Sequence, residues 1–184
     1  MSSILSKFIK SINFLFYGSI SKKEFYMIRS MNQLLQSATK QEILSAIEVA
    51  LKNSSESPFW AEKVLPLSDA VLSVLIELRE QNLLFNPEGM PEENLHVELF
   101  LRWCDLYSLR FMAFTLQKSN DAKELKNTKY DNLTCKSYKE LDLEELGGYL
   151  SSYKVDLENM MVDFPVTNYN LHVGIHDVLK KLLK

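Results

Sequence analysis

The chain has 184 residues, of which 46% are hydrophobic and 24% are charged, a length and a balance that favour one folded domain and exclude a largely disordered protein. The formal net charge of −3 excludes a general attraction of the whole molecule to nucleic acid or anionic lipid, although local basic patches remain. Only five Gly and five Pro residues occur, which argues against a turn-rich all-β fold and favours long helices.

The first fifty residues carry three helical patterns. Residues 3–17 have apolar positions at helical spacing, with lysines between them and no small-residue cleavage site after them, so an amphipathic helix is favoured over a secretory signal. Ser21 with Glu24, and Thr39 with Glu42, form two capping boxes. These predict helices from 21 to about 37 and from 39 to about 52.

The most apolar stretch of the chain, residues 58–80, is predicted to be its central helix. Pro58 suits the first helical position, where its missing N–H has no cost. Apolar residues recur at spacings of three and four until almost no polar face remains, and such a helix belongs in the middle of a bundle. Pro66 predicts a kink in this helix without a break.

The second half of the chain continues the helical pattern. In order, it predicts a loop at 82–94, a helix at 92–118, a polar segment at 118–132, helices at 137–153 and 156–164, and a last helix at 168–183. Gly147 and Gly148 predict either a break or a close helix approach. The fold class is therefore all-α, a multi-helix bundle of about six to eight helices around the kinked helix 58–80, in a single domain over residues 1–184.

Two sets of residues raise the question of catalysis. His172 and His176 stand four apart on one helix and could supply two zinc ligands, but Val173 occupies the place of the Glu in the catalytic form of that spacing. Surface or capping histidines are favoured, and a metal-dependent hydrolase is the alternative. Cys104 and Cys135 lie far apart, so free thiols in a reducing compartment are favoured over a disulfide, with Cys104 buried and inert. No cofactor is expected.

A contact surface is predicted where charge and expected exposure coincide. Its candidate residues are Lys123, Lys126, Lys129, Tyr130, Glu140, Asp142, Glu144 and Glu145. The four carboxylates are typical of a solvated helix face, with an acidic docking surface for a basic partner as the alternative. Lysines beside an exposed aromatic ring could also contact single-stranded DNA, although ordinary surface lysines are favoured by the negative total charge.

Residues 45–78, which read SAIEVALKNSSESPFWAEKVLPLSDAVLSVLIEL, resemble the type IV coupling proteins, the hexameric ATPases of the TraG/TraD and DotL kind, which include the Cag coupling protein. Members of this family carry a helical insertion, the all-alpha domain, in a RecA-like motor. The resemblance rests on the triplet Pro58, Phe59 and Trp60 before a long aliphatic helix, and more loosely on residues 143–150. Phe59 and Trp60 are expected to fill the junction with the preceding helix.

The resemblance implies a domain that receives effector proteins or relaxase–DNA complexes, and binds adaptors, at the cytoplasmic face of the bacterial inner membrane. It implies docking grooves and chain ends that lie near each other, and a hexamer only as part of the longer ATPase. This chain has no nucleotide-binding loop, so we expect an isolated domain without catalysis of its own. Pro66 and the Pro- and Glu-rich loop after Asn82 depart from the family pattern. The alternative is a free-standing helical adaptor or effector that binds another protein.

Overall fold

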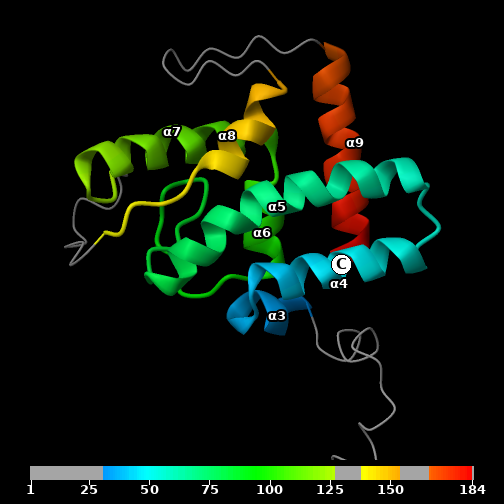
Figure 1. The fold of residues 1–184 in the computed structure, drawn as a ribbon, viewed down its shortest axis with the longest axis horizontal. Helices are drawn as coiled ribbons and strands as arrows, with labels where there is room; N and C mark the ends of the chain where they lie inside the picture. Colours follow the sequence, from blue (N-terminus) through cyan, green and yellow to red (C-terminus); the bar gives the residue numbers. More distant parts are fainter. Residues whose placement is uncertain (1–30, 127–137, 154–165, 184) are drawn as a thin grey trace, which may run out of the picture. The chain divides into compact units, whose positions relative to one another are not determined.

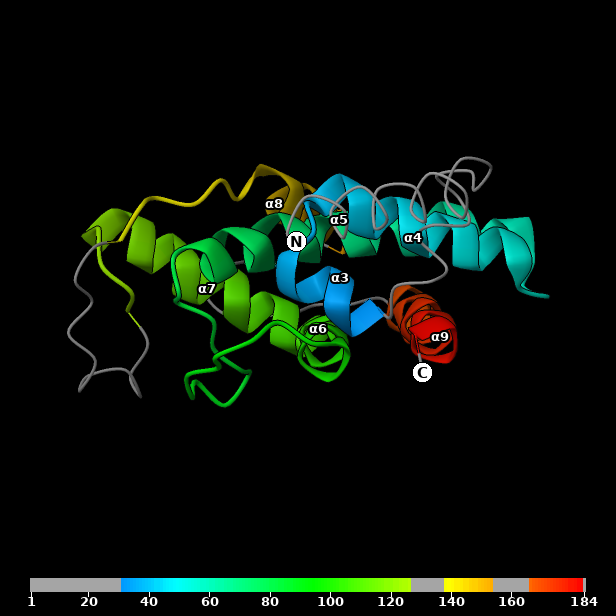
Figure 2. The same ribbon diagram turned by 90° about the horizontal axis from the view of Figure 1, so that it is seen from below.

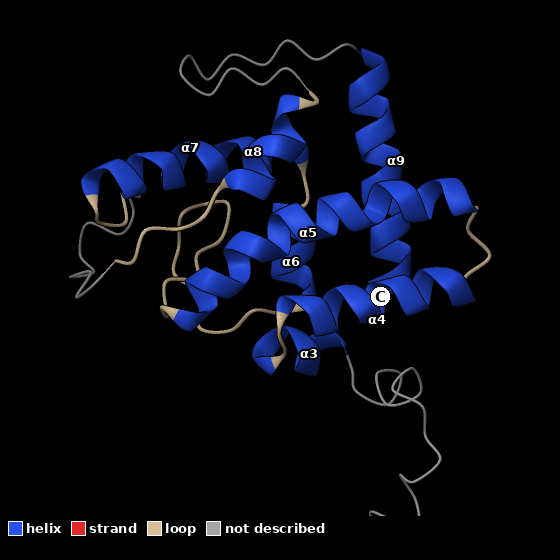
Figure 3. Ribbon diagram, viewed as in Figure 1, coloured by secondary structure: helices blue, strands red, loops and turns tan. Residues whose placement is uncertain are grey.

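The structure is a computed structural model, and it describes residues 31–126, 138–153 and 166–183. Met31–Lys184 form one compact unit and residues 1–30 fall in another, so a single domain over the whole chain stays a prediction. The described helices are α3 (Met31–Ser37), α4 (Lys40–Asn53), α5 (Pro58–Glu80), α6 (Val97–Trp103), α7 (Leu106–Ala122), α8 (Glu144–Ser151) and α9 (Val166–Leu183) (Figure 1). Within the described residues no strand occurs (Figure 3), and the predicted all-α bundle is confirmed.

The central position of α5 is confirmed. The helix runs from Pro58 to Glu80 without interruption at Pro66, and it contacts α4, α6, α8 and α9. Most of its apolar side chains between Val64 and Leu78 are buried. In Figure 1, α4 and α5 lie side by side and α9 crosses both, and Figure 2 shows α6 and α9 on the same side of that pair. Burial from several sides explains why this stretch has so little polar surface.

The first turn of α5 differs from the expectation. Phe59 is 48% exposed, so its predicted role in filling the α4–α5 junction is wrong. Its ring lies edge-on to Trp60, with centroids 5.2 Å apart, and Lys63 Nζ lies 5.8 Å from its centroid. The indole of Trp60 points instead to α9, where it lies against Gly174. The reason is that α9 crosses α5 there, so a bulky ring on that face meets α9.

Helices α3 and α4 are joined as the second capping box predicts. The Thr39 hydroxyl accepts from Glu42 N at 3.3 Å, and Glu42 Oε2 accepts from Thr39 N at 2.9 Å. From α5, Arg79 donates to Leu35 O at 2.7 Å and to Ala38 O at 2.9 Å. These carbonyls at the end of α3 lack helical partners, so the guanidinium satisfies them and ties α3 to α5. The end of the predicted helix 21–37 is confirmed as α3, and residues 21–30 of it, like the predicted helix 3–17, lie outside the described residues.

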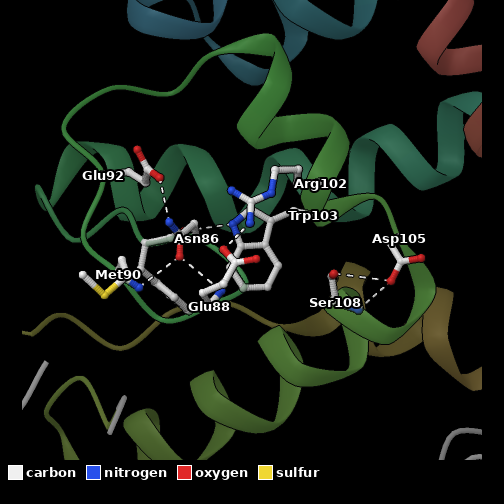
Figure 4. Close-up of polar contacts among 9 residues, drawn as sticks. Asn86, Glu88, Met90, Glu92, Arg102, Trp103, Asp105 and Ser108 are labelled. Carbon is white, nitrogen blue, oxygen red and sulfur yellow. Dashed lines mark hydrogen bonds and ion pairs between the residues drawn. The ribbon is translucent and has the colours of Figure 1, made fainter. Parts of the chain in front are cut away.

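The loop after α5 is held by a compact set of polar contacts (Figure 4). Asn86 Oδ1 accepts from Glu88 N and Met90 N at 3.1 and 3.0 Å, and Asn86 Nδ2 donates to Glu92 Oε1 at 2.9 Å. A fully buried Trp103 donates from Nε1 to Phe85 O at 2.8 Å. The predicted loop is confirmed, but Glu92 belongs to it and does not begin a helix.

The predicted helix 92–118 is therefore wrong in two respects. It begins only at Val97, with His96 as N-cap, and it is interrupted between Trp103 and Leu106. The interruption comes from Asp105, whose Oδ1 accepts from Tyr107 N at 3.0 Å and from Ser108 N at 3.1 Å; Figure 4 shows the contact with Ser108. An aspartate that caps its own following amides starts a new helix, so two helices replace one.

The predicted helix 137–153 is shorter in the structure. Residues 138–143 are not helical, and α8 begins at Glu144. Two side-chain amides hold this segment by reciprocal bonds. Lys139 N donates to Gln81 Oε1 and Gln81 Nε2 donates back to Lys139 O, at 2.8 and 3.1 Å. In the same way, Leu141 N donates to Asn120 Oδ1 at 3.0 Å, and Asn120 Nδ2 donates back to Leu141 O at 2.8 Å. These bonds replace the helical ones, which is why the segment is not helical.

Gly147 and Gly148 neither break α8 nor bring another helix close. A Cβ on either residue would meet nothing within 4 Å, so both readings of this pair are wrong. The last helix, α9, begins two residues earlier than predicted and is otherwise confirmed. The predicted helix 156–164 lies outside the described residues. Among the helices that are described, none is both long enough and apolar enough to span a membrane.

Candidate pocket between α5, α8 and α9

A pocket of about 570 Å³ lies between α5, α8 and α9. We call it the α5–α8–α9 pocket. Helix α5 lines it with Glu62, Lys63, Pro66, Asp69 and Ala70. The α8 region lines it with Glu145, Gly148, Tyr149, Ser152 and Tyr153. Helix α9 adds Asn168, Leu171 and Ile175.

The lining residues follow from helical spacing. On α5 they recur at intervals of three and four from Glu62 to Ala70, on α8 from Glu145 to Ser152, and on α9 from Asn168 to Ile175. Residues at these intervals share one face of a helix. The pocket is therefore the place where three helix faces meet and where Gly148, which has no side chain, leaves space between them.

A chain of hydrogen bonds runs inward from the pocket. The hydroxyls of Tyr153 and Tyr149 are 3.1 Å apart, Tyr149 Oη is 3.0 Å from His172 Nδ1, and His172 Nε2 is 2.8 Å from Cys104 O. A carbonyl oxygen can only accept, so Nε2 carries the proton. In the neutral imidazole Nδ1 then accepts from Tyr149, and Tyr149 accepts from Tyr153. The direction of every bond in the chain is thereby determined.

Burial disfavours the charged forms of His172 and Tyr149. Burial lowers the pKa of His172 and outweighs its hydrogen bond to the Cys104 carbonyl, and His176 lowers it further while Asp105 opposes. Burial, together with the bond to Tyr153, raises the pKa of Tyr149. Burial also raises the pKa of the Cys104 thiol, with Asp105 adding to the effect. Cys104 is a free thiol with no exposed surface, as predicted.

The outer edge of the pocket is charged. Lys40 Nζ lies 2.9 Å from Asp69 Oδ1 and 3.4 Å from Glu145 Oε1, so one ammonium group joins α4, α5 and the first turn of α8. Burial disfavours the charged amine of Lys40, but the two carboxylates outweigh it and raise its pKa. The lysine is therefore fully protonated at neutral pH, and its positive charge is held at the edge of the pocket.

The predicted contact residues are only partly brought together. Of those that the structure describes, Glu145 alone lines the pocket. Lys123 is exposed just after α7, and Lys126 is exposed and paired with Glu124. Asn120, one turn before Lys123, bonds Leu141, which lies between two of the predicted carboxylates. The end of α7, just before Lys123, therefore lies beside the segment that carries Glu140 and Asp142.

The remaining predicted contact residues divide into two sets. Glu140, Asp142 and Glu144 are exposed, and Asp142 Oδ1 accepts from Glu144 N at 2.9 Å, which is an ordinary role for a carboxylate ahead of a helix. Lys129 and Tyr130 lie outside the described residues, as does Cys135.

The two histidines of α9 do not form a pair of metal ligands. Both ring nitrogens of His172 have hydrogen-bond partners, Tyr149 and Cys104. In the described ranges, no three His, Cys, Asp or Glu side chains come together in a way that could hold a metal ion. The structure shows His172 as a buried, hydrogen-bonded side chain, so the surface or capping role favoured for it is wrong.

Sequence reasoning missed most of the pocket. The sequence pattern predicts no site at Tyr149 or Tyr153 and favours a surface or capping role for His172, because the contacts of His172 with Tyr149 and Cys104 form only when helices pack. One signal was available: Gly148, Ser152 and Tyr149 interrupt the apolar pattern of the predicted helix on one face. Comparison of the chain with protein-family models, with curated proteins and with solved structures gives no match.

Proposed function

We propose that this chain is a protein-recognition domain without catalysis of its own, and that it takes a segment of a partner protein into the α5–α8–α9 pocket. The observation that carries the proposal is the pocket, about 570 Å³ and lined by three helix faces. Ligand-binding sites typically have volumes of about 300–1,000 Å³ and mostly apolar walls with a few polar groups. A groove between helices is also a common receptor for a peptide.

The polar groups that line the pocket or lie behind it support binding over chemistry. His172, the strongest candidate for a general base, has both nitrogens engaged within the protein. Tyr149 has a raised pKa and therefore keeps its proton. General acid–base catalysis needs a group whose pKa lies near the working pH and which reaches the substrate. These two residues are better suited to holding α8 and α9 together.

The resemblance to type IV coupling proteins gives this function a context. In that context the partner is a secretion substrate or an adaptor, and the chain works as the all-alpha domain of a longer ATPase at the cytoplasmic face of the membrane. Protein is the better partner, because the lining residues that the structure describes carry three carboxylates, Glu62, Asp69 and Glu145, against the one amine of Lys63. This balance disfavours the phosphates of DNA.

The test uses the two adjacent glycines of α8 as a matched pair. Gly148 lines the pocket and Gly147 does not, and a Cβ at either position meets nothing within 4 Å. Phe at position 148 therefore fills the pocket, while Phe at position 147 is the control. The full chain is titrated by calorimetry with each of the proteins encoded by the two genes that flank the gene for this chain.

We expect at least one of these proteins to bind. Gly148→Phe should weaken its binding by tenfold or more, and Gly147→Phe should leave the affinity unchanged. Binding that is lost in the double variant Lys123→Glu/Lys126→Glu, but not in Gly148→Phe, would move the contact to the surface predicted from the sequence. Absence of any binding protein in the set would overturn the proposal.

A further inference from the structure

The edge of the α5–α8–α9 pocket already binds a primary ammonium group. Lys40 Nζ lies within 3.4 Å of carboxylate oxygens from both Asp69 and Glu145. Both of these carboxylates also line the pocket. Lys40 comes from the first turn of α4, where the positive end of the helix dipole disfavours a cation. The two carboxylates offset this cost. Their pairing with Lys40 therefore shows that they can bind a positively charged group.

The charges around the pocket are not balanced. Its lining contains the carboxylates of Glu62, Asp69 and Glu145 and the amine of Lys63. Lys63 Nζ also lies 5.8 Å from the Phe59 ring centroid, so it is attracted to that ring one turn earlier in α5. Among the described residues, three negative groups face two positive ones even when Lys40 is added. A ligand that brings a positive charge is favoured over one that brings a negative charge.

The rest of the lining suits an apolar group. Pro66, Ala70, Leu171 and Ile175 contribute aliphatic surface, and Tyr149 and Tyr153 contribute rings. A site that combines aliphatic and aromatic walls with carboxylates at its edge accepts an apolar body with a cation beside it. Aromatic faces add attraction for a cation.

We infer that the pocket takes a protein segment in which an apolar side chain stands near an arginine or lysine, and that this cation competes with Lys40 for Asp69 and Glu145. The inference rests on the proposed function and gives the chemistry of the partner. Arginine should bind better than lysine, because its planar fork can bond two carboxylate oxygens at once.

Competition makes an unusual prediction for Lys40. A basic residue near an acidic binding site usually affects the affinity for a basic ligand only by repelling it. Here Lys40 occupies the carboxylates directly, so Lys40→Met should free both of them and tighten the binding of the ligand. Partly exposed ion pairs contribute about 0.2–1 kcal/mol, which corresponds to about a 1.5- to fivefold gain in affinity. Asp69→Asn and Glu145→Gln should each weaken binding.

The test uses fluorescein-labelled 12-residue peptides and the full chain, with binding followed by fluorescence anisotropy. One set of peptides pairs a leucine with an arginine at each separation from one to four residues. A second set replaces the arginine by glutamate, and a third replaces the leucine by serine. Thermal unfolding of each protein variant checks that the fold is retained.

We expect at least one Leu–Arg peptide to bind, its Glu and Ser counterparts to bind at least tenfold more weakly, and Lys40→Met to tighten the binding. Gly148→Phe should abolish it and Gly147→Phe should not. The inference is overturned if no Leu–Arg peptide binds, if the Glu peptides bind equally well, or if Lys40→Met weakens binding or leaves it unchanged. A protein from the flanking genes could bind the chain and lose that binding in Gly148→Phe, while the peptides give one of these negative results. In that case the proposed function stands, and only the inferred preference for an apolar and basic segment is wrong.

Discussion

Gly174 of α9 lies directly against the indole ring of Trp60 in α5, so that a Cβ placed on Gly174 would be 2.7 Å from Trp60 Cη2. Real Cβ atoms do not approach a ring carbon so closely, and the absence of a side chain at Gly174 is what lets α9 cross α5 at this point. The same crossing positions Leu171 and Ile175 at the pocket. The contact therefore determines the geometry of one pocket wall.

The first prediction concerns this contact. Gly174→Ala should destabilise the protein by about 1–3 kcal/mol, the usual cost of excess volume in a packed site, although alanine is the better helix former. Gly148→Ala is the matched control. It should raise the free energy of unfolding by up to about 1 kcal/mol, because Gly148 lies within α8 and a Cβ there meets no other atom within 4 Å. Urea unfolding measures both. Trp60→Phe, which shortens the ring, should reduce the penalty of Gly174→Ala, and a penalty that persists unchanged would contradict the steric explanation.

A second prediction concerns Arg79, which donates to Leu35 O and Ala38 O at the end of α3. Arg79→Met keeps much of the side-chain volume but leaves these two carbonyls without their donor. We expect a loss of about 1.5–3 kcal/mol in unfolding free energy, as for hydrogen bonds to a charged group. Arg102→Met serves for comparison, since Arg102 pairs with an exposed Glu88, and should cost less than about 1 kcal/mol. Equal losses in the two variants would refute the role of Arg79.

A third prediction tests the reciprocal amide pair between Asn120 and Leu141. Asn120→Asp preserves the shape and the acceptor that receives Leu141 N, but it cannot donate to Leu141 O. The segment 138–143 should then exchange its amide hydrogens faster, with a loss of about 1–3 kcal/mol for the carbonyl that no longer receives a bond. Hydrogen exchange with mass spectrometry resolves the segment. Protection that stays at its original level in the variant would show that Asn120 is not what holds it.

A fourth prediction follows from the neutral His172. Its pKa is lowered in the folded protein, first by burial, so below a pH of about 6.5 the unfolded chain binds the proton more readily than the folded one. Stability is therefore retained above that pH and is lost as the pH falls toward the folded pKa. The loss is at most about 1.4 kcal/mol per pH unit for one group.

The comparison for His172 is with His172→Gln, which cannot titrate. Urea unfolding at several pH values between 7.5 and 5 should give a steeper fall for the native protein than for the variant, and the carboxylates that titrate in both proteins cancel in the difference. Parallel curves would mean that His172 is equally easy to protonate in the folded and unfolded chains.

Local patterns in the sequence predicted a large part of this fold. The Thr39–Glu42 capping box, the Pro58 helix start and the apolar period of α9 depend on neighbours a few residues away. The predicted helix boundaries are wrong where hydrogen bonds from a polar side chain decide the backbone conformation against the apolar periodicity. Asp105 divides one predicted helix into α6 and α7 by capping two amides. Asn120 and Gln81 hold residues 138–143 in a non-helical conformation, although the pattern assigned them to a helix.

Hydrophobic period and caps act over one or two turns, so the amino-acid pattern is enough to predict a helical chain with residues 58–80 at its centre. The pocket depends on how the helices pack. Lys40, Asp69 and Glu145 are far apart in the chain, and so are Cys104, Tyr149 and His172. Side chains this distant meet only when helices pack, and helix packing depends on which faces fit together, such as Trp60 against Gly174, a choice that no local pattern records.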